Sequence, residues 1–259
     1  HALPEGAVLT IGPAARGGYG YLALAGGIAT EPVLGSRAAH LAAGIGRPLA
    51  AGDTLPLGAP EAGARPPGST LTPRERFEGG TLRVLPGAQT GAFSEAQRAR
   101  FEREAFAKDT RANRQGVRLQ PEGAGFDAEG GLSVTSEAIV PGDIQIVGGG
   151  APFVLLAECQ TTGGYPRIGT VISADLPRVA QAPAGAAFRF RFVTMEEALA
   201  ARAEATAHAA GLPRALVPLV RDPADIPDLL AYELIDGVTS GHGHDEARPD
   251  EADHDEESR

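Results

Sequence analysis

Gln160-Thr161-Thr162-Gly163-Gly164-Tyr165-Pro166-Arg167 is the stretch that decides the predicted fold. An apolar run at residues 153–157 precedes it, and a β-branched run at 168–172 follows it. This order predicts a β-hairpin whose tip is longer than a turn requires. Extra length at a hairpin tip is typical of a binding loop. The alternative is a plain turn with solvated polar residues, because Gly and Pro clusters are common in turns.

The side chains of this stretch offer hydrogen bonds and one cation. Gly163 and Gly164 lack a Cβ, so they can adopt positive φ angles and let backbone N–H groups approach an anionic or carbonyl oxygen. Arg167 supplies a planar cation suited to carboxylate or phosphate. Neutral hydrogen-bonding groups come from Gln160, Thr161, Thr162 and Tyr165. The stretch is therefore a candidate site for an anionic or carbonyl ligand.

Composition favours a β-rich chain with room for one large or two smaller domains. The 259 residues include 35 Gly, 21 Pro and no Trp, which favours many short strands joined by turns over a helical bundle. A single cysteine, Cys159, excludes an internal disulfide and is compatible with a reducing compartment, so we expect a cytoplasmic protein. No apolar run approaches ~20 residues, and no membrane partner is expected.

The distribution of charge separates a tail from the rest of the chain. The formal net charge is −10, and much of the excess lies in residues 242–259, which we expect to be a disordered acidic tail. Its histidines and carboxylates predict incidental metal affinity rather than a dedicated metal site. Lys108 is the only lysine, so a phosphate-neutralising patch is absent and no nucleic-acid partner is expected.

Taken in order, the chain predicts two strand-rich units. Strands at 7–11 and 19–24 open the first unit, and a Pro/Gly/Ala-rich linker follows. The second unit has predicted strands at 81–85, 114–119, 131–135, 143–147 and 188–192, and helices at 95–106 and from Thr194 to 208. Short strands with few helices predict a closed barrel or a sandwich. Weak likeness between the units indicates either a duplicated domain or a coincidence of β-composition.

Several segments carry a resemblance to a known family. They are 20–28 with 33–37, 82–87, 113–119, and 157–168 with 172–177, the last pair holding the Gln-Thr-Thr-Gly-Gly-Tyr-Pro string. Together they resemble the biotin-dependent carboxyltransferase family, which includes the C subunit of 5-oxoprolinase, allophanate hydrolase subunit 2 and the carboxyltransferase region of urea carboxylase. The resemblance covers residues from about 7 to 200.

The resemblance implies a mainly β fold with a few helices, built from two cyclophilin-like β-barrel domains. The expected divisions are 1–58 as the C-terminal part of a first barrel truncated at its N-terminus, 59–80 as a linker, 81–212 as a second barrel, 213–241 as a helical extension, and 242–259 as the tail. The functional cleft is expected between or beside the barrels.

The function implied by the resemblance is that of one component of a larger enzyme. With partners like the A and B subunits of 5-oxoprolinase, it would hydrolyse 5-oxo-L-proline to L-glutamate, with ATP as the cofactor of the assembly. One alternative is a carboxyltransferase subunit that moves carboxyl from carboxybiotin to a urea-like amide. Another is a non-catalytic regulatory module that antagonises a kinase inhibitor.

The candidate site residues follow from the loop chemistry and the matched motifs. Substrate binding is assigned to Gln160, Thr161, Thr162, Gly163, Gly164, Tyr165, Arg114 and Arg118. Asp175 and Arg167 are the candidate catalytic residues, Asp175 as a base or hydrogen-bond acceptor and Arg167 as an anion clamp. The plain alternatives are a solvated Arg118 and an Asp175 that caps a turn. The family commonly has Lys at 167 and Met at 115, and an arginine cannot act as a neutral base.

Overall fold

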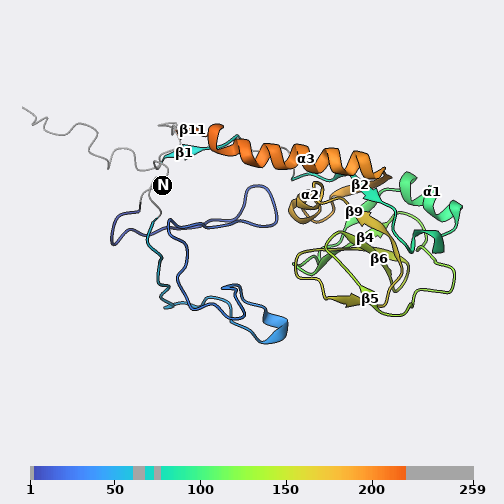
Figure 1. Ribbon diagram of the computed structural model, residues 1–259, viewed down its shortest axis with the longest axis horizontal. Helices are drawn as coiled ribbons and strands as arrows, with labels where there is room; N and C mark the ends of the chain where they lie inside the picture. The colour runs from blue at the N-terminus through green and yellow to red at the C-terminus, as the bar shows by residue number, and fades with distance from the viewer. Residues whose placement is uncertain (1–2, 61–67, 73–76, 220–259) are drawn as a thin grey trace, which may run out of the picture. The chain divides into compact units, whose positions relative to one another are not determined.

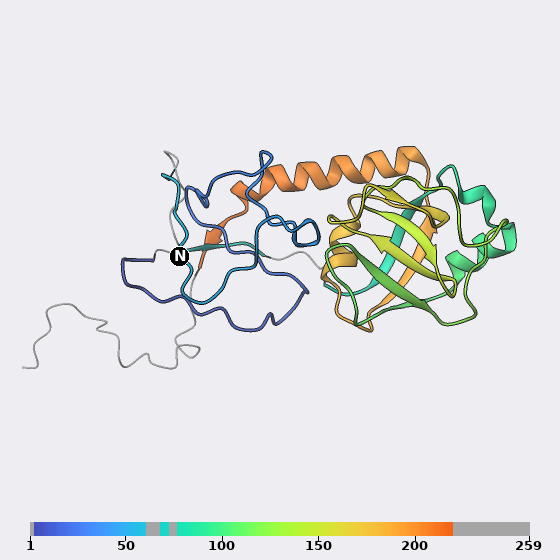
Figure 2. The ribbon, with the colours of Figure 1, turned by 90° about the horizontal axis from the view of Figure 1, so that it is seen from below.

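Residues 80–192 contain the seven strands of a closed β-barrel (Figures 1 and 2). The computed structural model describes residues 3–60, 68–72 and 77–219. In barrel order the strands are β10 (Ala187–Phe192), β2 (Gly80–Leu85), β9 (Arg167–Val171), β6 (Asp143–Val147), β7 (Ala151–Leu155), β4 (Gly116–Pro121) and β3 (Phe106–Lys108). β10 and β2 run parallel, and the other neighbours in the barrel are antiparallel. The prediction of a mainly β chain with a barrel in this region is confirmed.

The barrel core is aromatic, and alternation along β10 shows why. Phe188 and Phe190 are buried while Arg189 and Arg191 are exposed, as the alternating sequence predicts for a strand covered on one face. Phe101, on helix α1 (Glu95–Arg103), stacks on Phe190 with ring centroids 4.2 Å apart. Helix α1 thus closes over the barrel by inserting an aromatic side chain into its core.

Capping groups set the helix ends. The Ser94 hydroxyl accepts a hydrogen bond from the Gln97 N–H at the start of α1, and a full capping box of Thr194 and Glu197 starts α3 (Met195–Gly211), as predicted. Lys108 is buried beside the end of α2 (Leu176–Gln181), where its Nζ donates to three carbonyl oxygens at 2.7–3.0 Å. Burial lowers the pKa of Lys108.

The remaining elements are short. Two small ribbons pair β1 (Ser69–Thr70) with β11 (Val217–Pro218) and β5 (Glu137–Ala138) with β8 (Thr162–Gly163). The 3₁₀ turns are η1 (Leu41–Ala43), η2 (Thr90–Ala92) and η3 (Leu212–Arg214). Strand β1 lies inside the segment 59–80, which the sequence predicted to be a linker. None of the helices in the described part of the chain is long and apolar enough to cross a membrane.

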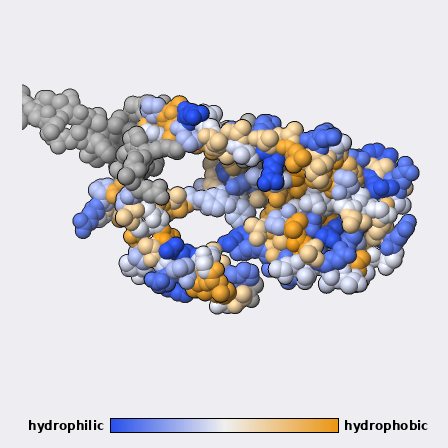
Figure 3. Space-filling model, viewed as in Figure 1, coloured by the Kyte–Doolittle hydropathy of each residue, from blue (hydrophilic) through white to orange (hydrophobic). Residues whose placement is uncertain are grey.

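The predicted strands at 7–11 and 19–24 are wrong. Among residues 3–60 the structure has η1 and isolated bridges such as Ile28 to Leu57, and a second barrel is not found in the described residues. Large apolar side chains stay exposed there, including Val8 at 89% and Tyr21 at 90%, and hydrophobic residues are visible at the surface in Figure 3. A β-prone segment becomes a strand only when a neighbour completes its backbone hydrogen bonds and a core covers one face.

Three other predictions of the second unit are corrected. Residues 153–157 and 168–172 do not form a hairpin, because β7 and β9 both pair with β6 instead of each other. No strand forms over 131–135, and Phe106 lies in β3 rather than in the first helix. The predicted helix at 225–235 and the tail at 242–259 lie outside the described residues.

Candidate functional site

The loop between β7 and β9 is long because it must cross β6. It starts on one side of β6 and ends on the other, since the barrel order is β9-β6-β7. On the way it forms β8, whose Thr162 and Gly163 pair with Ala138 and Glu137 of β5. The Ile139 N–H donates to the Thr161 carbonyl oxygen at 3.1 Å and extends this ribbon. These contacts hold the loop between β7 and β9, here called the crossing loop, over the outer face of β6.

Beneath the crossing loop lies a pocket of about 380 Å³. It contains five of the residues that the sequence predicted for substrate binding: Gln160, Thr162, Gly163, Gly164 and Tyr165. The residues that sequence reasoning missed are Gln115, Ser136, Ile139, Gln145, Phe153, Leu155 and Cys159. None of the described lining residues carries a charged side chain. The volume and the mix of apolar and neutral polar groups are typical of a small-molecule pocket.

Strand alternation explains how the missed residues come into the pocket. In β6 the side chains of Ile144 and Ile146 are fully buried in the barrel core, so Gln145 points to the opposite face. The crossing loop covers that face, and Gln145 is only 6% exposed. The sequence signal was a single Gln between two isoleucines, which on its own predicts a solvated outer position.

The two glycines of the loop act by close packing and not by unusual backbone angles. Gly163 and Gly164 do not use the positive φ angles that glycine allows, since neither residue adopts one. A Cβ on Gly163 would instead lie 2.3 Å from Gln145 Nε2, well inside contact distance. A Cβ at position 163 would therefore displace the Gln145 amide, and glycine lets the loop lie directly on that amide.

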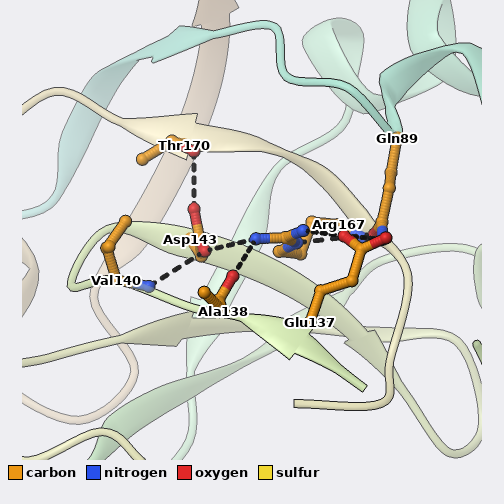
Figure 4. Close-up of polar contacts among 7 residues, drawn as sticks. All are labelled: Gln89, Glu137, Ala138, Val140, Asp143, Arg167 and Thr170. Atoms are coloured by element: carbon orange, nitrogen blue, oxygen red, sulfur yellow. Dashed lines mark hydrogen bonds and ion pairs between the residues drawn. The ribbon is translucent and has the colours of Figure 1, made fainter. Parts of the chain in front are cut away.

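Arg167 is the centre of a polar cluster that fixes the small ribbon (Figure 4). Its Nη1 donates to Asp143 Oδ2 at 3.1 Å and to the Ala138 carbonyl oxygen at 2.8 Å, and its Nη2 donates to Glu137 Oε2 at 2.6 Å. The Arg167 N–H and Nε both donate to Gln89 Oε1. Arg167 thus joins β9 to β6 and β5, and its guanidinium is committed to groups of the protein.

Asp143, in the same cluster, is held from three sides. It is 3% exposed, and besides Arg167 it accepts hydrogen bonds from the Thr170 hydroxyl at 2.7 Å and the Val140 N–H at 3.1 Å. A buried carboxylate with these partners is compensated in place. The cluster therefore stabilises the β5–β8 ribbon, which carries the lining residues Thr162 and Gly163.

The other predicted charged residues do not converge on the pocket. Asp175 is 5% exposed and accepts from the Arg83 Nη2 and Nε at 2.7 and 2.9 Å, a hydrogen-bonded pair that raises the pKa of Arg83. Arg114 pairs with Glu158 next to the pocket residue Gln115. Arg118 lies on β4, where its buried Nε has no hydrogen-bond partner among the residues described. Of the predicted arginines, Arg114 is the one that adjoins a lining residue in sequence.

Cys159 lines the pocket as a protonated thiol at neutral pH. Burial raises its pKa, and the negative charge of Asp143 raises it further. We expect iodoacetamide at pH 8 to alkylate Cys159 more slowly than a free cysteine, because the thiolate is the reactive form. Mass spectrometry of timed samples measures the rate, and the urea-unfolded chain is the control that restores it. Equal rates in the folded and unfolded chains would contradict the assignment.

No metal centre is found in the part of the chain that the structure describes, where no group of three or more His, Cys, Asp or Glu side chains could hold an ion. The His-containing tail lies outside the described residues. The lining residues of the pocket themselves offer neutral hydrogen-bonding groups and apolar contacts.

Comparison with known proteins identifies the family. Residues 1–192 match the family described as carboxyltransferase domain, subdomain A and B. The C subunit of 5-oxoprolinase from Escherichia coli is 36% identical over 204 residues, 77% of this chain and 64% of the relative. The protein of the same name from Haemophilus influenzae is 33% identical over 197 residues, 74% of this chain and 62% of the relative. The chain thus spans less than two thirds of the length of these curated relatives.

Solved structures agree with this match. The crystal structure of TTHA0988 superposes with a TM-score of 0.54 at 35% identity, over 65% of this chain and 32% of that one. Kluyveromyces lactis urea carboxylase superposes with a TM-score of 0.56 at 22% identity, over 78% of this chain and 21% of that one, and so shares the fold. Because the family match extends over residues 1–192, this chain belongs to the carboxyltransferase domain family of subdomains A and B.

Proposed function

We propose that this chain is a subunit of an ATP-dependent 5-oxoprolinase, which hydrolyses 5-oxo-L-proline to L-glutamate together with partner subunits. The observation that carries the proposal is the uncharged pocket under the crossing loop, in a chain 33–36% identical to two 5-oxoprolinase C subunits. Because those relatives are named as one subunit of an enzyme, their name supports a hetero-oligomer.

The reaction opens a stable lactam, and the pocket suits its binding. ATP bound elsewhere in the assembly would supply the phosphoryl group that makes the ring carbon electrophilic. With two waters consumed, the ring C–N bond opens and the products are glutamate, ADP and phosphate. The amide and hydroxyl groups of Gln145, Gln160 and Thr162 can hold and orient the neutral ring for these steps.

The same lining does not fit a nucleoside triphosphate. Phosphate sites need cations or a glycine-rich nest of N–H groups, and the described lining residues include no cation. We therefore assign ATP to a partner subunit and derive no step from phosphate contacts here. Arg114, beside Gln115, is the residue we propose for the substrate carboxylate. Arg114 is paired with Glu158 but exposed, whereas the side chains of Arg167 and Asp175 are largely buried in their ion pairs, so we propose positioning roles for those two residues.

We propose that residues 1–58 form the C-terminal part of a first cyclophilin-like barrel, which precedes the barrel described above. The matched family description names two subdomains. Residues 3–60 also expose large apolar side chains, such as those of Val8 and Tyr21, that a barrel would bury.

Thr162→Ala is expected to lower kcat/KM for glutamate formation by about tenfold, the size of one lost hydrogen bond to substrate. The assay contains 5-oxo-L-proline, ATP, the full-length natural protein and the subunits encoded beside it. Thr206→Ala on the exposed part of α3 is the matched control and should keep full activity. Absence of glutamate despite a stable complex would contradict the oxoprolinase proposal.

Carboxyl transfer is the second candidate, because the matched family is named for it and an uncharged pocket also suits the ureido ring of biotin. Carboxybiotin would supply the transferable carboxyl group when bound, and the residues available to hold its ring are the same neutral lining groups. A complex that forms no glutamate, but carboxylates a urea-like amide once biotin carboxylase and a biotinylated carrier are added, would favour this candidate.

A further inference from the structure

Gln145 is the least explained side chain of the pocket. Its amide is buried, with 6% of the residue exposed, and its Nε2 has no hydrogen-bond partner among the described residues. Buried amide donors in folded proteins nearly always have a partner, because desolvation without one is costly. The missing partner is therefore expected to come from whatever enters the pocket.

The surroundings of Gln145 hold its amide at the pocket. The residue is one of those that line the cavity, and the strand places it opposite the core residues Ile144 and Ile146. Gly163 lies directly against the amide, at a distance that leaves no room for a Cβ. Strand β6 on one side and the crossing loop on the other fix the position of Gln145 Nε2. A hydrogen-bond donor is therefore in place before a ligand binds.

Charge around the pocket selects the kind of acceptor. The described lining residues carry no cation, and the carboxylates that adjoin lining residues in sequence, Glu137 and Glu158, are each paired with an arginine. A carboxylate in the pocket would lose its hydration without a cation to replace it, whereas a neutral carbonyl oxygen needs only a hydrogen-bond donor such as the Gln145 amide.

We propose that Gln145 donates its Nε2–H to the carbonyl oxygen of a neutral cyclic amide, so that the lactam end of the ligand enters the pocket and its carboxylate points outward. This inference rests on the proposed function and deepens it, because it names the lactam carbonyl as the substrate group that the site recognises. Gln145 is in this respect a specificity-determining residue and not an acid or a base.

The test measures binding to the assembled full-length complex by isothermal titration calorimetry, with protection of Cys159 from iodoacetamide as a second readout. The ligands are 5-oxo-L-proline and cyclopentanecarboxylate, which keeps the ring and the carboxylate but has no ring carbonyl. Gln145→Met keeps the length of the side chain and removes the donor. It should weaken 5-oxo-L-proline binding about tenfold and leave cyclopentanecarboxylate binding unchanged. Gln120→Met, at an exposed position of β4, is the matched control.

The outcomes separate this inference from the proposed function. Equal weakening of both ligands would show a packing role and overturn the inference. Gln145→Glu places an acceptor where the donor was, so unchanged affinity in that variant would also overturn it. The wild-type complex could instead bind imidazolidin-2-one but not 5-oxo-L-proline, with a tenfold loss of imidazolidin-2-one affinity in Gln145→Met. In that case the oxoprolinase proposal fails and this inference stands. Failure of both carbonyl ligands to bind would overturn both.

Discussion

Gly163→Ala is expected to lower 5-oxo-L-proline hydrolysis by the assembled complex by about 100-fold, the usual size of the effect when binding groups move by about 1 Å. The added Cβ would lie 2.3 Å from Gln145 Nε2 and 3.1 Å from Ile139 Cγ2. The amide is the flexible end of a side chain, so we expect it to swing into the pocket and occupy the space for the substrate. The barrel itself should keep its stability, because the backbone of β6 need not move.

Steady-state kinetics and thermal unfolding of the same samples check this expectation. Gly148→Ala is the matched control, since a Cβ there meets nothing within 4 Å and the position lies in the turn after β6. Its activity and melting temperature should equal those of the wild type. Full activity in Gly163→Ala would show that the contact with Gln145 has no part in substrate binding.

Phe101→Ala is expected to lower the free energy of unfolding by about 3–5 kcal/mol, the range for large aromatic side chains removed from a core. The ring is fully buried and stacks on Phe190 at 4.2 Å. It also meets Phe106 at 5.6 Å and Phe126 at 5.8 Å between ring centroids. No smaller side chain from α1 can fill that space, so a cavity remains between the helix and the barrel.

Urea denaturation followed by circular dichroism measures the loss. Phe77→Ala serves as the comparison, because Phe77 is only partly buried and its ring faces Arg16 at 5.3 Å; about 1 kcal/mol is expected there. Similar losses in the two variants would mean that α1 does not close the barrel core as described.

Local patterns in the sequence predicted the elements whose causes are local. The alternation in 188–192 indicated a half-buried strand, and β10 has that pattern. Thr194 and Glu197 indicated a helix start, and both capping hydrogen bonds form. In each case residues a few positions apart determine the backbone, so one segment contains the required information.

Predictions failed where distant segments decide the outcome. The loop at 160–167 was expected to join paired strands, but β6 lies between β7 and β9, and this order is set by barrel closure. Gln145 could not be found because its burial depends on a loop that follows it in the chain. The strands expected at 7–11 and 19–24 lack a neighbouring strand within the described residues.

The parallel pair of β2 and β10 has a consequence for synthesis of the chain. β2 is the first strand of the barrel in sequence and β10 the last, so the seam that closes the barrel joins residues 80–84 to residues 188–192. While the ribosome makes the intervening strands, β2 has an open edge whose N–H and C=O groups lack that partner. Such edges pair readily with other chains. We expect this edge of β2 to stay open to other chains until residue 192 has left the ribosome.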